Sequence, residues 1–86
     1  MTIRVKRKIH SSVKKKGAVD LAAIGRRIRE LRGFDMQQSE MAEILGISQS
    51  QLSKYERGES EPTLEILLRL RDRYQKSVDW ILTGEE

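Results

Sequence analysis

Amide, hydroxyl and basic side chains line one face of a short helix that is predicted to follow Ser48. They are Gln49, Ser50, Ser53, Lys54 and Arg57. None of them is acidic, although the 86-residue chain holds 13 acidic residues. Glutamine can form two hydrogen bonds with the edge of adenine, lysine can donate to the acceptors of guanine, and serine can bond a base or a phosphate. This outer face suits contact with nucleic acid, and a plain solvated face on a small helical bundle is the alternative.

The outer face is positioned by two short predicted helices, which a glycine turn joins within residues 37–57. The first helix ends at Gly46, which suits the left-handed backbone that terminates many helices. Its apolar stripe consists of Met36, Met41, Ala42 and Leu45. The second helix begins at Ser48 with Gln51 three residues on, a spacing typical of a reciprocal capping box. Two helices joined by so short a glycine-containing turn form a helix-turn-helix arrangement.

The flanking sequence predicts three further helices. Asp20 is a good cap for a first helix, whose buried stripe would comprise Leu21, Ile24, Ile28 and Leu31. A fourth helix starts after the Pro62-Thr63 pair. Its apolar side would comprise Leu64, Leu67, Leu68, Leu70 and Tyr74. Ser77 can cap a last helix that ends at Gly84 and is too short to be stable without packing against the bundle or a second subunit.

Four segments of the chain together carry a family resemblance. In chain order they are IGRRIRELR, QQSEMAEILGISQSQLSKYERG, EPTLEILLRL and SVDWILTG. They resemble the lambda-repressor-like (Xre/Cro-type) helix-turn-helix DNA-binding family from about Asp20 to Gly84. The resemblance implies an all-α, five-helix domain whose third helix enters the major groove of double-stranded DNA. It also implies a sequence-specific transcriptional regulator, most often a repressor, that acts as a homodimer on a near-palindromic operator with half-sites about 34 Å apart.

The resemblance also assigns roles to individual side chains. The family's base-reading positions correspond to Gln49, Ser50, Ser53 and Lys54. Its phosphate-contacting positions correspond to Gln38, Ser48 and Arg57. Arg32 corresponds to the partner of Glu56 in an ion pair that is structural and not catalytic. The alternative role for Gln38 is a helix cap, and for Lys54 and Arg57 it is an ordinary solvated cation.

Two stretches depart from the family's pattern. The link over residues 32–36 is one residue shorter than usual, and Phe34 stands where a polar residue is more common. The loop after the third helix reads Glu59-Ser60-Glu61, where relatives often carry cations that grip a phosphate. An acidic loop near DNA is repelled by the backbone, which predicts weaker affinity but leaves the base-reading helix unchanged.

The first 19 residues form a basic arm with no acidic residue. Its cations are Arg4, Lys6, Arg7, Lys8, Lys14, Lys15 and Lys16. The rest of the chain carries 10 cations and all 13 acids, so its net charge is −3 against +7 for the arm. If all seven cations displaced counterions from duplex DNA, log affinity against log salt would have a slope of about −6. We expect the arm to contact DNA; a disordered tail and a strand paired across a dimer are the alternatives.

The sequence divides into the basic arm (1–19), a helix-turn-helix domain (20–84) and a tail (85–86). It has no cysteine, its only histidine is His10, and it contains no H-E-x-x-H, G-x-S-x-G or phosphate-cradling glycine motif. No apolar run approaches the roughly 20 residues that span a bilayer. We therefore expect no enzymatic activity, no metal, no cofactor and a cytoplasmic, nucleoid-associated location for a protein of bacterial or phage origin. An antitoxin, or another module that binds a protein partner such as a toxin, is the alternative function.

Overall fold

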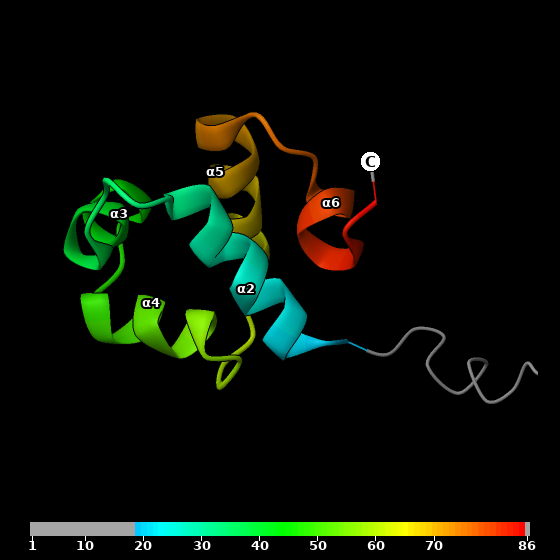
Figure 1. Ribbon diagram of the computed structural model, residues 1–86, viewed down its shortest axis with the longest axis horizontal. Helices are drawn as coiled ribbons and strands as arrows, with labels where there is room; N and C mark the ends of the chain where they lie inside the picture. The colour runs from blue at the N-terminus through cyan, green and yellow to red at the C-terminus, as the bar shows by residue number, and fades with distance from the viewer. Residues whose placement is uncertain (1–18, 86) are drawn as a thin grey trace, which may run out of the picture.

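The computed structural model describes residues 19–85, which contain five α-helices joined by turns and loops (Figure 1). In chain order they are α2 (Leu21–Arg32), α3 (Gln38–Leu45), α4 (Gln49–Glu56), α5 (Leu64–Tyr74) and α6 (Val78–Thr83). No strand occurs among these residues. The predicted all-α, five-helix fold is therefore confirmed. The seven arm cations fall within residues 1–18, outside the described residues, so the role of the arm stays a prediction.

Side-chain caps start four of the helices where the sequence predicts them. Asp20 Oδ1 accepts the N–H of Ala23 at 3.1 Å, and Ser48 Oγ accepts the N–H of Gln51 at 3.0 Å. The equivalent caps of α5 and α6 are Thr63 and Ser77. Each cap satisfies a backbone donor that a helix N-terminus leaves without a partner, which fixes where the helix begins.

The turn between α3 and α4 is built around Gly46. Its φ of 74° and ψ of 30° place it in the left-handed region, as predicted. The reciprocal capping box predicted for α4 is wrong in one half, because the side chain of Gln51 does not return to Ser48. Gln51 Nε2 donates instead to Ser60 Oγ at 3.1 Å. This bond ties the first turn of α4 to the loop that follows the helix.

The core draws side chains from all five helices. Those that are fully buried are Ile24, Ile28, Met41, Leu45, Leu52, Leu70 and Ile81. The apolar side predicted for α5 is wrong at two leucines, because Leu64 and Leu68 are 79% and 46% exposed. Ile66, which the prediction left out, is buried instead. The inward stripe of α5 runs through Ile66, Leu67 and Leu70, and at 3.6 residues per turn the other two leucines lie outside it.

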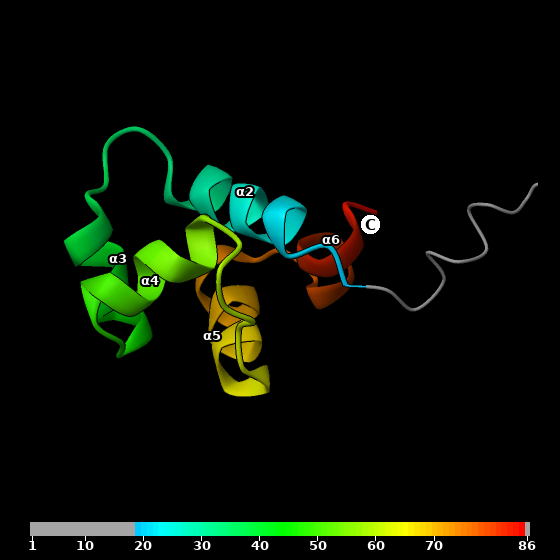
Figure 2. The same cartoon turned by 90° about the horizontal axis from the view of Figure 1, so that it is seen from below.

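Helices α2 and α4 approach closely at Gly25, a residue to which the sequence assigned no role. A Cβ atom here would lie 2.4 Å from the carbonyl oxygen of Tyr55 and 2.6 Å from that of Glu56. Any larger residue would clash, so glycine allows α2 to pack against the last turn of α4. Figure 1 shows α4 along the lower edge of the molecule, and the view from below in Figure 2 shows that no other described helix covers it.

Candidate nucleic-acid interface

Most of the seven helix-turn-helix side chains predicted to contact DNA meet on the open side of α4. Gln49, Ser50, Lys54 and Arg57 are exposed, and Ser53 is half-buried. A shallow hollow of about 400 Å³ is lined by Gln38, Gln49, Ser50, Ser53 and Arg57. The fold thus brings the predicted phosphate contact of α3 next to the predicted base contacts of α4.

Ser48 and Lys54 do not line this hollow. Ser48 Oγ accepts a backbone bond from Gln51, which leaves its hydroxyl hydrogen available to a phosphate. The side chain of Lys54 is exposed and makes no hydrogen bond or ion pair with a described residue. Its ammonium group is therefore available to an acceptor outside the chain.

A series of hydrogen bonds runs from the interior of the protein to the outer face. Arg32 donates through Nε to Glu56 Oε2 and through Nη2 to Glu56 Oε1, both at 2.9 Å. Gln38 Nε2 donates to the same Oε1 at 3.0 Å, and Gln49 Nε2 donates to Gln38 Oε1 at 3.4 Å. Because a carboxylate only accepts, Glu56 fixes which end of the Gln38 amide faces inward. The core thereby orients a predicted base-reading side chain at the surface.

The Arg32–Glu56 pair is the buried end of this series. Its side chains are 15% and 5% exposed, and Arg32 Nη1 also donates to the carbonyl oxygen of Met36 at 3.1 Å. The hydrogen bonds to Glu56 raise the pKa of Arg32 above its ordinary value, although burial acts in the opposite direction. The pair joins the end of α2 to the last turn of α4 and to the start of α3.

Arg57, at the C-terminal end of α4, is held by Glu59 of the next loop. Its Nε and Nη2 donate to the two carboxylate oxygens at 2.9 and 3.0 Å, and its Nη1 donates to Ser53 Oγ. The hydrogen bonds from Arg57 lower the pKa of Glu59 below its ordinary value. Sequence reasoning placed both residues near DNA but did not connect them. The signal that could have found the contact is an opposite charge two residues further on, past a helix end.

The short loop between α2 and α3 presents Phe34 fully to solvent. A neighbouring hollow of about 570 Å³ is lined by Arg26, Arg29, Glu30, Arg32, Gly33 and Phe34. Arg26 and Arg29 make no hydrogen bond or ion pair with a described residue through their side chains. An exposed aromatic ring beside unpaired arginines has the composition of a protein-binding surface.

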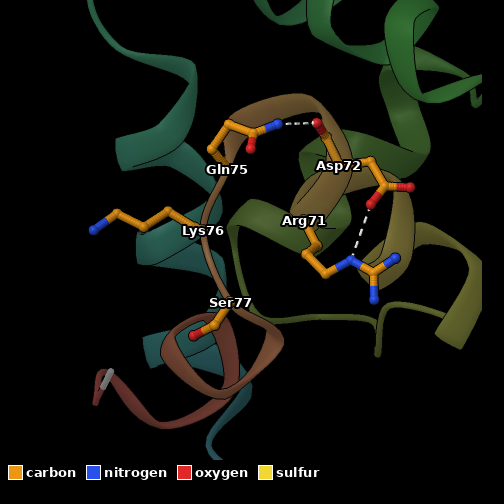
Figure 3. A pocket seen from close by; sticks show the side chains of 5 residues that line it. All are labelled: Arg71, Asp72, Gln75, Lys76 and Ser77. Carbon is orange, nitrogen blue, oxygen red and sulfur yellow. Dashed lines mark hydrogen bonds and ion pairs between the residues drawn. The ribbon is translucent and has the colours of Figure 1, made fainter.

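Another polar hollow lies at the turn between α5 and α6, and its side chains bond to other residues of the same turn (Figure 3). Arg71 pairs with Asp72 at 2.9 Å, and Gln75 Nε2 donates to the carbonyl oxygen of Asp72 at 2.7 Å. The ammonium group of Lys76 lies 4.7 Å from the centroid of the Trp80 ring. Figure 3 shows the side chains of this turn pointing in different directions. They stabilise the end of α5 and do not converge on a ligand.

Metal-binding clusters and membrane-spanning helices are both missing from residues 19–85. No group of three or more His, Asp or Glu side chains in this range is placed to hold a metal ion. No helix in the same range is long and apolar enough to cross a membrane.

Known proteins share this architecture and much of its sequence. A family model described as helix-turn-helix matches residues 26–81. The HTH-type transcriptional regulator DicA of Escherichia coli is 44% identical over 64 residues, which are 73% of this chain and 47% of DicA. The HTH-type transcriptional regulator ImmR of Bacillus subtilis is 37% identical over 67 residues, which are 74% of this chain and 51% of ImmR. This chain thus spans about half the length of these two relatives.

A solved structure of the P22 c2 repressor, in complex with a synthetic operator, has the same fold. It is similar with a TM-score of 0.66 and 36% sequence identity, over 72% of this chain and 96% of that one. The segment matched by the family model contains all of α3 and α4 and the whole outer face. The chain therefore belongs to the lambda-repressor-like helix-turn-helix family of DNA-binding proteins.

Proposed function

We propose that this chain binds double-stranded DNA sequence-specifically through α4 and represses transcription. One observation carries the proposal: the series of hydrogen bonds from Arg32 through Glu56 and Gln38 holds Gln49 on an open face without acidic residues. A side chain that is already held from behind loses less freedom on binding, so its hydrogen bonds to a base edge contribute more affinity. The names of DicA and ImmR, and the P22 c2 repressor on its operator, support the same function.

In the proposed complex, α4 lies in the major groove and α3 crosses the DNA backbone. The side chains that read bases are Gln49, Ser50, Ser53 and Lys54. Gln38 and Ser48 bond phosphates, and Gln38 is helped by its place in the first turn of α3, where the helix carries partial positive charge. Arg57 lies at the far end of the outer face, within reach of the same duplex. No step of this function requires catalysis or a cofactor.

The proposal includes a homodimer on a near-palindromic operator, with half-sites about 34 Å apart. Support comes from apolar side chains that the described fold leaves exposed on α5 and α6. Leu64, Leu68 and Leu82 are 79%, 46% and 38% exposed, and Leu64 and Leu82 line one hollow with Val19. A second copy could cover this surface. The mass of the protein in solution, with and without DNA, tests this part; a monomer in both cases contradicts it.

The main test is selection of binding sites from random duplex DNA, with the full-length chain at about 0.15 M salt. The expected result is an enriched near-palindrome with half-sites about one helical turn apart. The contrary result is no enrichment, together with salt-sensitive binding that disappears when residues 1–18 are removed. That result would confine DNA contact to the basic arm.

Substitutions on α4 then test which side chains read bases. Gln49→Ala and Lys54→Ala should each weaken operator binding by about 1–3 kcal/mol and relax the choice of base at one position. Arg26→Ala is the matched control, because it removes an exposed, unpaired cation from α2 instead of α4. Equal weakening on every DNA sequence would show that α4 does not read bases.

A second candidate function is binding of a protein partner such as a toxin. The exposed Phe34, which lines one hollow with Arg26 and Arg29, favours it, as does the net charge of −3 on residues 20–86. A toxin-like reading frame beside the gene would support this candidate, whereas a divergent promoter would support the repressor. Phe34→Ser should then abolish a complex with the neighbouring gene product while leaving operator binding unchanged.

A further inference from the structure

We propose that Glu59 sets the sequence specificity of DNA binding by holding Arg57 as a hydrogen-bond donor to a base edge, so that Arg57 does not act as a counterion for phosphate. The inference rests on the DNA-binding function proposed above. It assigns a function to an acidic residue that family resemblance marked only as repulsive. It also replaces the phosphate contact predicted for Arg57 with a base contact.

The geometry of Arg57 leaves a specific part of its guanidinium free. Glu59 takes one N–H of Nε and one of Nη2, and Ser53 takes one of Nη1. Three of the five N–H groups are therefore used, and the two that stay free belong to Nη1 and Nη2. These two nitrogens form the end of the guanidinium fork, which can bond O6 and N7 of guanine together. Because Ser53 belongs to the outer face, its contact with Nη1 places that end among the other base-reading candidates.

The position of Glu59 is fixed by the loop around it. Its backbone N–H donates to the carbonyl oxygen of Lys54 at 2.9 Å. The next residue, Ser60, accepts the bond from Gln51 at 3.1 Å. Gly58, with a φ of 75°, packs so closely on Ala22 that a Cβ atom would lie 2.9 Å from the Ala22 Cα. The backbone of Glu59 is therefore fixed beside the end of α4, within reach of Arg57.

Charge balance explains why this arrangement favours bases over phosphates. The attraction of an arginine for the DNA backbone is electrostatic and independent of sequence, and a carboxylate in contact with the arginine cancels most of it. Hydrogen bonds to guanine acceptors depend on the direction of the N–H groups and survive the cancellation. Specificity is a difference between two affinities, so lowering the affinity for unrelated DNA raises it.

The chain offers a matched control for the test in Glu61. Glu59→Gln and Glu61→Gln each remove one negative charge from the same loop, but only Glu59 touches Arg57. The dissociation constants of both full-length variants are measured on the selected operator and on an unrelated duplex of equal length, over a series of salt concentrations. We expect Glu59→Gln to bind unrelated DNA more tightly, to steepen the salt slope by about 1, and to lower the specificity ratio about fivefold or more. Glu61→Gln should tighten both complexes alike and leave the ratio unchanged.

Two further variants show whether Glu59 acts through Arg57. Site selection with Arg57→Gln should lose a guanine preference at one position in each half-site. Adding Glu59→Gln to Arg57→Gln should change the specificity ratio no further. Equal tightening of operator and unrelated DNA by Glu59→Gln would overturn the inference, because Glu59 would then be repulsive only. Absence of an enriched site for the unaltered protein would instead contradict the proposed function, so the two failures are distinguishable.

Discussion

Two arginine–glutamate pairs meet at the C-terminal end of α4, one facing the core and the other facing solvent. Glu56 and Arg57 are neighbours in the sequence, yet Glu56 pairs back to Arg32 and Arg57 pairs forward to Glu59. In both pairs, Nε of the arginine lies 2.9 Å from a carboxylate oxygen. The exposure differs: 15% and 5% for the side chains of the inner pair (Arg32 and Glu56), 55% and 53% for those of the outer pair (Arg57 and Glu59).

This comparison teaches that burial, and not bond geometry, separates the roles of the two pairs. Removing one partner of the inner pair would leave a charge without a partner in a medium that solvates it poorly. Water can replace either partner of the outer pair at little cost. The inner pair therefore stabilises the fold, whereas the outer pair contributes little to the stability of the fold.

The largest expected effect comes from breaking the inner pair. Glu56→Ala should lower the free energy of unfolding by about 3–5 kcal/mol, because Arg32 would stay buried without its partner. Urea denaturation followed by circular dichroism measures this loss. The corresponding change in the outer pair, Glu59→Ala, should leave the unfolding midpoint unchanged. Similar losses in the two variants would contradict the distinction between the pairs.

Gly25→Ala should lower the free energy of unfolding by a smaller amount, because it disturbs the end of α4, next to both ion pairs. The added methyl group would meet the carbonyl oxygens of Tyr55 and Glu56 and push α2 away from the last turn of α4. Overpacking of this kind costs about 1–3 kcal/mol of stability. Operator affinity should fall as well, since α4 is displaced. Thermal unfolding and DNA titration of one preparation check both effects, and a variant that matches the unaltered protein in both would refute the proposed close packing.

Gln38→Ala sharpens the comparison by cutting the link from the inner pair to the outer face. It removes the hydrogen bonds to Glu56 and Gln49 but keeps the Arg32–Glu56 pair. We expect operator binding to weaken by about 0.5–1.5 kcal/mol, with a smaller change in the free energy of unfolding. Fluorescence anisotropy with a labelled operator measures the first and urea denaturation the second. Loss of stability without loss of binding would show that Gln38 belongs to the fold alone.

The smallest expected effect is that of pH near neutrality. Glu59, whose pKa is lowered in the folded state, contributes its contact above its ordinary pKa and loses it only as pH falls through the lowered value. Arg32, whose pKa is raised, contributes below its ordinary pKa and loses its contact only as pH rises through the raised value. The specificity ratio should therefore stay constant between about pH 6 and pH 8. A change that persists in His10→Gln, which lacks the only histidine, would contradict this expectation.

Local features of the fold could be predicted from the sequence because they depend on neighbouring residues. The caps at Asp20 and Ser48 and the left-handed turn at Gly46 each follow from one residue and its next few positions. The buried side of α5 could not be predicted in the same way. Leu64 and Ile66 are both large apolar residues, and only the packing of the whole bundle determines which one is buried.

The candidate interface shows the same division. The outer face could be read from helical spacing, because side chains at those intervals share one side of a helix. The hydrogen-bond partners of Gln51 and Arg57 could not be predicted in this way. These partners, Ser60 and Glu59, lie in a loop whose path depends on where Gly58 packs against α2. The role of Gly25 also escaped prediction, because a close approach between helices distant in sequence leaves no local signal.

The length of α4 limits the number of base pairs that one copy of the chain can contact in the proposed complex. Its eight residues extend over about 12 Å, which matches roughly four base pairs at 3.4 Å each. A given sequence of four base pairs recurs by chance about every 256 base pairs. A single α4 would therefore find thousands of matching sequences among the roughly 10⁶ or more sites of a genome. Two such sequences at a fixed separation recur about once in 65,000 base pairs, and any further discrimination needs contacts beyond α4. If α4 reads bases as proposed, the selection of one promoter therefore requires more than one copy of the chain, with each α4 recognising part of the operator.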